Sequence, residues 1–186
     1  MKRAPSMLYH GVCDDEANRS MPTLVLMRHA EAAPAAAGGG DHERALTPAG
    51  LAQAEAAGRS LARLGILPTI AVVSTARRAQ ETYSALAAAL PALVEMRPDR
   101  ALYDADPETI LATLRADAAG AGTAMLIAHN PGVGSLATTL AKGRGKPPIR
   151  SFGTATIGIF DFESDEWAPG KASLRQLIVT PVDQAL

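Results

Sequence analysis

Residues 23–31, Thr-Leu-Val-Leu-Met-Arg-His-Ala-Glu, constrain the fold of this chain more than any other stretch. A continuous apolar run rich in Val and Leu is typical of a strand that is buried on both faces, as in a parallel sheet. No turn residue separates this run from Arg28 and His29. Ligands of open α/β sheets bind outside the carboxyl ends of the strands, so Arg28 and His29 stand where a functional site is expected.

Short apolar runs alternate with helical patterns along the rest of the chain. Strands are predicted at 70–73, 93–96 and 123–128 and near 154–162 and 173–179, and helices at about 47–64, 76–90 and 130–141 and from Asp106 onward. Ser74 or Thr75 is expected to cap the helix at 76–90. The alternation indicates an α/β fold with a parallel or mixed sheet covered by helices on both faces, in which the last two strands pair antiparallel.

Composition narrows the function classes. The 186 residues are 47% hydrophobic and carry a net charge of −1, which argues against a nucleic-acid or membrane-surface binder. A single cysteine, Cys13, and the lack of a long apolar stretch lead us to expect a cytoplasmic protein. We interpret residues 1–21 as a polar N-terminal extension and 22–186 as one domain.

Polar residues follow the second and fourth predicted strands as well. Ser74 with Arg77 and Arg78 comes after the second, and His129 comes after the fourth. The carboxyl ends of parallel strands share one edge, so the two histidines and two or three arginines are expected to converge there. Arginine forks and helix N-termini both bind phosphate oxygens. The pattern therefore predicts a phosphate pocket with a histidine placed as nucleophile, and Arg77 is expected to be a solvated helix residue.

Motifs at these boundaries resemble those of the histidine phosphatase superfamily, in particular its SixA-type phosphohistidine phosphatases. The motifs are Leu26–Ala32 (LMRHAEA), Arg44–Gly50 (RALTPAG), Ser74–Thr82 (STARRAQET, with Glu81 where the family usually has Gln) and Ile127–Pro131 (IAHNP). The resemblance covers about residues 22–180. It implies a phosphoglycerate mutase-like fold, a three-layer α/β/α sandwich with a mostly parallel central sheet.

The resemblance also implies roles for individual residues. His29 matches the nucleophile that becomes a transient phosphohistidine, with its ring held in one tautomer, as a neighbouring backbone carbonyl could do. Arg28 and Arg78 match the arginines that clamp the phosphoryl oxygens, and His129 matches the second histidine. Arg44 matches a further phosphate-contacting arginine, with a surface ion pair as the alternative. Neither a metal nor a cofactor is implied.

The general acid and the substrate stay open at this level. Related enzymes often carry a carboxylate after the third motif, which makes Asp104 the candidate; the alternative is a loop acid with no catalytic role. We expect a phosphohistidine protein phosphatase that acts on a phosphorylated protein. A phosphomonoesterase that acts on a small phosphorylated metabolite is the alternative, and a non-catalytic phosphate-binding domain is a third hypothesis from a different class.

Overall fold

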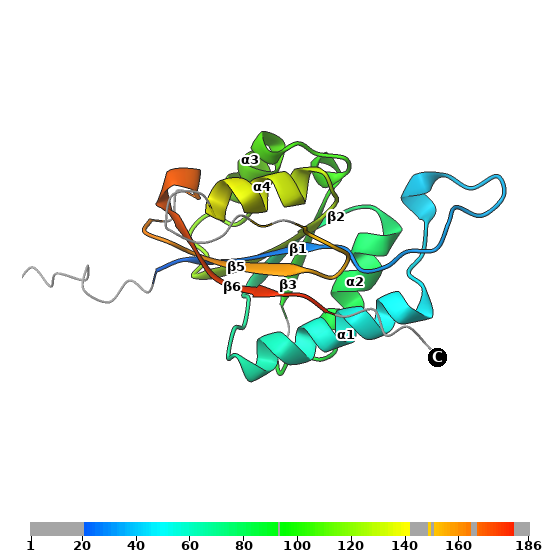
Figure 1. Ribbon diagram of the computed structural model, residues 1–186, viewed down its shortest axis with the longest axis horizontal. Helices are drawn as coiled ribbons and strands as arrows, with labels where there is room; N and C mark the ends of the chain where they lie inside the picture. Colours follow the sequence, from blue (N-terminus) through cyan, green and yellow to red (C-terminus); the bar gives the residue numbers. More distant parts are fainter. Residues whose placement is uncertain (1–20, 93, 142–148, 150, 165–166, 181–186) are drawn as a thin grey trace, which may run out of the picture.

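A six-stranded sheet forms the centre of the molecule (Figure 1). The computed structural model describes residues 21–180 apart from 93, 142–148, 150 and 165–166. The strands are β1 (Thr23–Arg28), β2 (Ile70–Ser74), β3 (Glu95–Asp99), β4 (Thr123–Ala128), β5 (Ile157–Phe162) and β6 (Ala172–Ile178), in the order β3-β2-β4-β1-β5-β6. The helices are α1 (Pro48–Arg63), α2 (Arg77–Ala87), α3 (Pro107–Asp117) and α4 (Gly132–Ala141), and short 3-10 turns lie at η2 (Asp41–Glu43), η3 (Arg100–Leu102) and η4 (Pro169–Lys171).

Strand register brings the expected site residues to one edge of the sheet. β1, β2, β3 and β4 are mutually parallel, while β5 and β6 pair antiparallel, which confirms the predicted mixed sheet. Arg28 is level with Ala128 in the β1–β4 pair, and Val73 is level with Ile127 in the β2–β4 pair. The carboxyl ends of the three central parallel strands therefore coincide.

Helices cover both faces of the sheet, as a buried parallel sheet requires. Figure 1 shows α3 and α4 on one side and α1 and α2 on the other. A hydrophobic core lies on each face of the sheet, and alternate residues of β1 point into one core or the other. Leu24 and Leu26 pack with residues of α3 and α4, whereas Val25 and Met27 pack with residues of α1 and α2. The expected α/β/α sandwich is confirmed. None of the helices in the described part of the chain is long and apolar enough to span a membrane.

Two predictions from the sequence are wrong in detail. The strand predicted at 93–96 is β3 at Glu95–Asp99, whose side chains are mostly exposed because β3 is an edge strand paired only with β2. Neither Ser74 nor Thr75 caps α2, because its N-cap is Ala76, which makes no side-chain capping bond. The extension predicted at 1–21 lies, apart from Met21, outside the described residues.

Candidate active site

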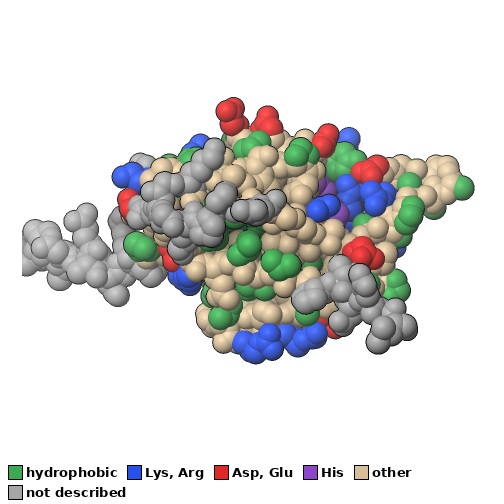
Figure 2. All heavy atoms as spheres, viewed as in Figure 1, with side chains coloured by type: hydrophobic (Ala, Val, Ile, Leu, Met, Phe, Trp, Pro, Cys, Tyr) green, Lys and Arg blue, Asp and Glu red, His purple; other side chains and the backbone are tan. Residues whose placement is uncertain are grey.

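The two histidines at the ends of β1 and β4 meet, as the sequence predicts. The ring centroids of His29 and His129 are 5.0 Å apart. Arg78, from the first turn of α2, places its Nε 3.3 Å from Nε2 of His29. His29, His129 and Arg78 are all buried, and Figure 2 shows histidine side chains reaching the surface beside basic ones. The edge of the sheet therefore carries a compact cluster of imidazoles and guanidinium.

His29 is held in one tautomer. Its Nδ1 lies 2.7 Å from the backbone oxygen of Ala30, which can only accept, so Nδ1 carries the ring proton. Nε2 then presents its lone pair and accepts from Arg78 Nε. The backbone is fixed on both sides, since His29 N–H donates to the oxygen of Ala128 and Ala30 N–H donates to Thr82 Oγ1. The carbonyl that we expected to orient the nucleophile is that of Ala30.

Both histidines are neutral at physiological pH. The pKa of His29 is lowered to about 4, first by burial and then by the charges of Arg78 and Arg28, although the hydrogen bond to Ala30 raises it. The pKa of His129 is lowered to about 3, first by burial and next by repulsion from His29, whose ring is itself protonated at so low a pH. A neutral imidazole with a free Nε2 is the form in which histidine can attack an electrophile.

Ser74 orients the second histidine rather than a helix. Its Oγ is 2.8 Å from Nε2 of His129 and accepts from the Ala76 backbone N–H at 3.4 Å. Nδ1 of His129 is buried and has no hydrogen-bond partner among the described residues. The sequence places Ser74 at this edge of the sheet but assigns it only a capping role, because a serine before a helix ordinarily indicates a cap.

Arg28 is the last residue of β1, directly before His29. Its Nη1 donates to the backbone oxygen of Phe152 at 3.3 Å, and its buried Nε has no partner among the described residues. Burial lowers the pKa of Arg28, although an arginine stays protonated under any physiological condition. Arg28 therefore brings a partly unpaired cation next to His29, as the family resemblance implies.

Arg78 and Arg44 both contact Asp41, a residue that the sequence did not single out. Arg78 donates from Nη1 to the backbone oxygen of Asp41 and from Nη2 to Oδ2, at 2.7 and 3.0 Å. Arg44 donates from Nη1 to Oδ1 at 2.9 Å and from Nε to the backbone oxygen of Ala33 at 2.7 Å. In this structure Arg44 is thus linked to Arg78 only through Asp41, and its predicted phosphate contact stays a prediction.

Tyr103 completes the wall of the site. Its hydroxyl donates to Asp41 Oδ2 at 2.7 Å, and its ring centroid is 5.4 Å from that of His129. The Cζ of Arg78 lies 5.7 Å from the same ring. Tyr103 and Arg44 are the first two causes that hold the pKa of Asp41 well below its usual range, so Asp41 is an anion rather than an acid.

Asp104, the candidate general acid, lies one residue beyond Tyr103. It is exposed, adopts a φ of 55° and makes no hydrogen bond or ion pair with the described residues. Its catalytic role stays a prediction. Arg77 is exposed and pairs with Glu81 at 2.7 Å, in agreement with the solvated role expected for it.

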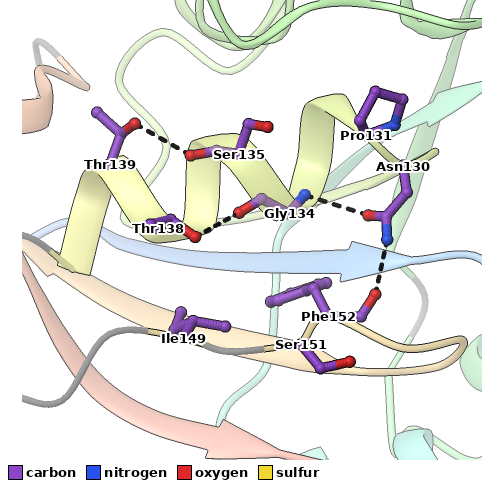
Figure 3. A pocket seen from close by; sticks show the side chains of 9 residues that line it. All are labelled: Asn130, Pro131, Gly134, Ser135, Thr138, Thr139, Ile149, Ser151 and Phe152. Carbon is purple, nitrogen blue, oxygen red and sulfur yellow. Dashed lines mark hydrogen bonds between the residues drawn. The ribbon is translucent and has the colours of Figure 1, made fainter.

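A groove of about 700 Å³ opens beside the site (Figure 3). Its described lining carries no charged side chain and consists of Asn130, Pro131, Gly134, Ser135, Thr138, Thr139, Ile149, Ser151 and Phe152. Asn130 Nδ2 donates to the backbone oxygen of Phe152 at 2.8 Å, the oxygen that also accepts from Arg28. The groove therefore starts where the Arg28 side chain ends.

Within the residues that the structure describes, no three His, Cys, Asp or Glu side chains are arranged to hold a metal ion. Metal independence stays a prediction.

Comparisons with known proteins agree with this geometry. The model of the histidine phosphatase superfamily (branch 1) matches residues 24–110. A candidate phosphohistidine phosphatase SixA from Nakamurella multipartitia has 30% identity and a TM-score of 0.72, covering 86% of this chain and 96% of its own. A candidate phosphohistidine phosphatase SixA from Agrobacterium tumefaciens has 26% identity and a TM-score of 0.72, covering 85% of this chain and 98% of its own.

A relative known from sequence covers less. An uncharacterized protein of Mycobacterium leprae is 34% identical over 102 residues, which are 54% of this chain and 60% of that protein. The chain thus spans about 60% of the length of this curated relative.

The chain belongs to the histidine phosphatase superfamily, and within it to the SixA-type branch. Its mixed sheet with helices on both faces is the phosphoglycerate mutase-like fold.

Proposed function

We propose that the protein is a metal-independent phosphatase that hydrolyses phosphohistidine on a protein, with His29 as the nucleophile. The observation that carries this proposal is the state of the His29 ring. Its Nδ1 proton is held by the Ala30 carbonyl, its pKa is low enough to keep it neutral, and its Nε2 faces the Arg78 guanidinium. These are the requirements for a nitrogen that attacks phosphorus next to a cation.

In the first step, the lone pair of His29 Nε2 forms a bond to phosphorus as the bond to the leaving nitrogen or oxygen breaks. The ring gains positive charge, and the hydrogen bond from Nδ1 to the Ala30 oxygen disperses it. In the second step, a water oxygen replaces Nε2 on phosphorus, which releases inorganic phosphate and restores the neutral ring. Arg28, Arg78 and His129 surround the transferred group, so positioning and charge stabilisation supply the catalysis.

Two observations support phosphohistidine as the substrate. The two SixA-type structures at 30% and 26% identity cover nearly all of their own chains. Asp104 makes no contact with either histidine among the contacts described, and a leaving imidazole requires less proton donation than a leaving alkoxide. The uncharged groove beside Arg28 gives the body of a substrate room to lie against α4 (Figure 3).

The test is a set of variants assayed on a panel of substrates: a phosphohistidine protein, sugar phosphates and an aryl phosphate. His29→Ala is expected to lose roughly a thousandfold or more in kcat on every substrate that the wild type cleaves. Arg78→Ala is expected to lose activity strongly, whereas the matched variant Arg77→Ala, which removes only an exposed ion pair, should retain it. Unchanged turnover in His29→Ala would exclude this mechanism.

The panel also decides the substrate class. Wild-type kcat/KM should be highest for the phosphohistidine protein. A preference for the sugar phosphates would show the protein to be a small-molecule phosphomonoesterase instead. Tight phosphate binding without turnover of any member would show a non-catalytic phosphate-binding domain.

A further inference from the structure

Asp41 occupies the side of the Arg78 guanidinium that a phosphoryl group would need. Its Oδ2 accepts from Arg78 Nη2 at 3.0 Å and from the Tyr103 hydroxyl at 2.7 Å, and its Oδ1 accepts from Arg44 Nη1 at 2.9 Å. The carboxylate therefore lies between two arginines, each of which donates one N–H bond to one of its oxygens, and arginine donors of this kind also bind phosphate oxygens. Arg78 is nearly buried, with 7% of its side chain exposed, while 52% of the Asp41 side chain is exposed.

The planar geometry of guanidinium makes this position specific. The Nε–H bond of an arginine is parallel to one N–H bond of Nη2, and the two form a fork that holds two adjacent acceptors. In Arg78, Nε faces His29 Nε2, while Nη2 and Nη1 donate to Asp41 Oδ2 and to the Asp41 backbone oxygen. Asp41 therefore occupies the two guanidinium donors next to the one that faces His29, and an oxygen of a phosphoryl group attacked by His29 needs those donors.

We propose that Asp41 is a specificity-determining residue: its carboxylate holds the anion position of Arg78 in the free enzyme, and the phosphoryl group of the substrate displaces it. This inference rests on the proposed function, because it takes the Arg78–His29 fork as the phosphoryl site. Only an anion that binds the two arginines better than a carboxylate does can enter. A doubly charged phosphoryl group meets this condition, and carboxylate metabolites do not.

The segment that carries Asp41 is built to move. The 3-10 turn η2 has three residues, buries none of them, and has no side-chain capping bond at Gly40. Gly38, at a φ of 78°, precedes it within an exposed stretch. Segments with few buried contacts open at low free-energy cost. The contacts that have to yield are those to Arg78, Arg44 and Tyr103, together with the bond of 3.1 Å between His42 Nε2 and Thr75 Oγ1 if the whole turn withdraws.

An anion can bind only to the fraction of molecules in which Asp41 is withdrawn. The apparent affinity for every anion is therefore the intrinsic affinity multiplied by this fraction. Removing the carboxylate should remove this penalty. Displacement also frees the Tyr103 hydroxyl, which then becomes a donor for the bound phosphoryl group. A supporting role for Asp41, in which it only holds Arg78 in place, predicts the opposite sign, because the loss of the support would weaken phosphate binding.

The experiment measures the Kd of inorganic phosphate by calorimetry on the full chain, in wild type, Asp41→Asn and Asp41→Ala. We expect phosphate to bind about fivefold more tightly to both variants, a value near the upper end for a half-exposed ion pair. Glu43→Gln is the matched control: Glu43 lies on the same turn, and its side chain bonds only to His42 among the described residues, so the Kd of this variant should equal that of wild type. Thermal unfolding confirms that each variant folds.

Added formate separates the two roles. In Asp41→Ala, formate should take the vacated place and weaken phosphate binding, whereas in wild type it should have no effect. Phosphate binding that is unchanged or weaker in the Asp41 variants, or that formate strengthens, would overturn the inference, and so would phosphate binding in none of the proteins. Tighter binding in the variants together with no turnover in wild type would keep the role of Asp41 and remove the proposed phosphatase activity.

Discussion

Acidification tests whether His29 is neutral for the reason that the structure gives. An unperturbed imidazole, with a pKa near 6.5, is about 90% protonated at pH 5.5. With its pKa lowered to about 4 by burial and by the charges of Arg78 and Arg28, His29 is only about 3% protonated at this pH. His129, with a pKa of about 3, is protonated still less. Two of the four histidines of the chain should therefore stay neutral far into the acid range.

The assay is NMR of the imidazole C–H groups from pH 7.5 to pH 4, with His29→Asn and His129→Asn used to assign the signals. This readout avoids the substrate, whose phosphate also titrates near pH 6. We expect the signals of His29 and His129 to keep their neutral shifts down to about pH 5. A midpoint near 6.5 for His29 would refute the argument, because it would mean that burial and the arginines do not act on the ring.

The same shift makes a prediction about stability. The folded pKa of His29 lies below the unfolded value, so its contribution to stability is fully present above about pH 6.5 and is lost as the pH falls toward about 4. Between pH 7 and pH 5 the loss from this one group is about 2 kcal/mol. Urea denaturation at the two pH values should show wild type losing about that much more unfolding free energy than His29→Asn. An equal loss in both proteins would contradict the prediction.

Two further substitutions test the supports of the site. Gly50→Ala is expected to lower the free energy of unfolding by about 3 kcal/mol, because the new Cβ would lie 2.0 Å from the backbone oxygen of Glu31; Gly40→Ala, where nothing lies within 4 Å, is the control, and equal unfolding midpoints would contradict the expectation. Ser74→Ala removes the partner of His129 Nε2 and should lower kcat on an aryl phosphate about tenfold, with KM less affected; an unchanged kcat would show that His129 needs no such orientation.

The sequence predicts the parts of the site that strand register determines. Arg28, His29 and His129 end buried parallel strands, and parallel strands in register bring their ends together. Arg78 follows from the same rule, one helical turn beyond β2. The order and direction of the strands are therefore enough to predict that these residues come together.

The parts that the sequence does not predict depend on contacts between distant loops. Asp41 reaches Arg78 across 37 positions and Tyr103 across 62, and no local pattern encodes either contact. Tyr103 and Asp104 are neighbours in a polar stretch, and the backbone conformation decides that the ring, rather than the carboxylate, faces His129. A serine just before a helix is typical of an N-cap. Only the position of His129 in the folded chain shows that Ser74 has another partner.

The placement of β1 within the sheet has a consequence for how the molecule opens. β1 is paired on both sides, with β4 and β5, and the His29 amide is bonded to Ala128. Such backbone exchanges its amide hydrogens only when the whole structure unfolds, whereas an exposed turn such as η2 exchanges them through small local openings. The proposed nucleophile, His29, is thus anchored in a part of the chain that opens last, whereas Asp41 lies on a turn that opens early. The displacement proposed for Asp41 can therefore occur many times while His29 keeps its place.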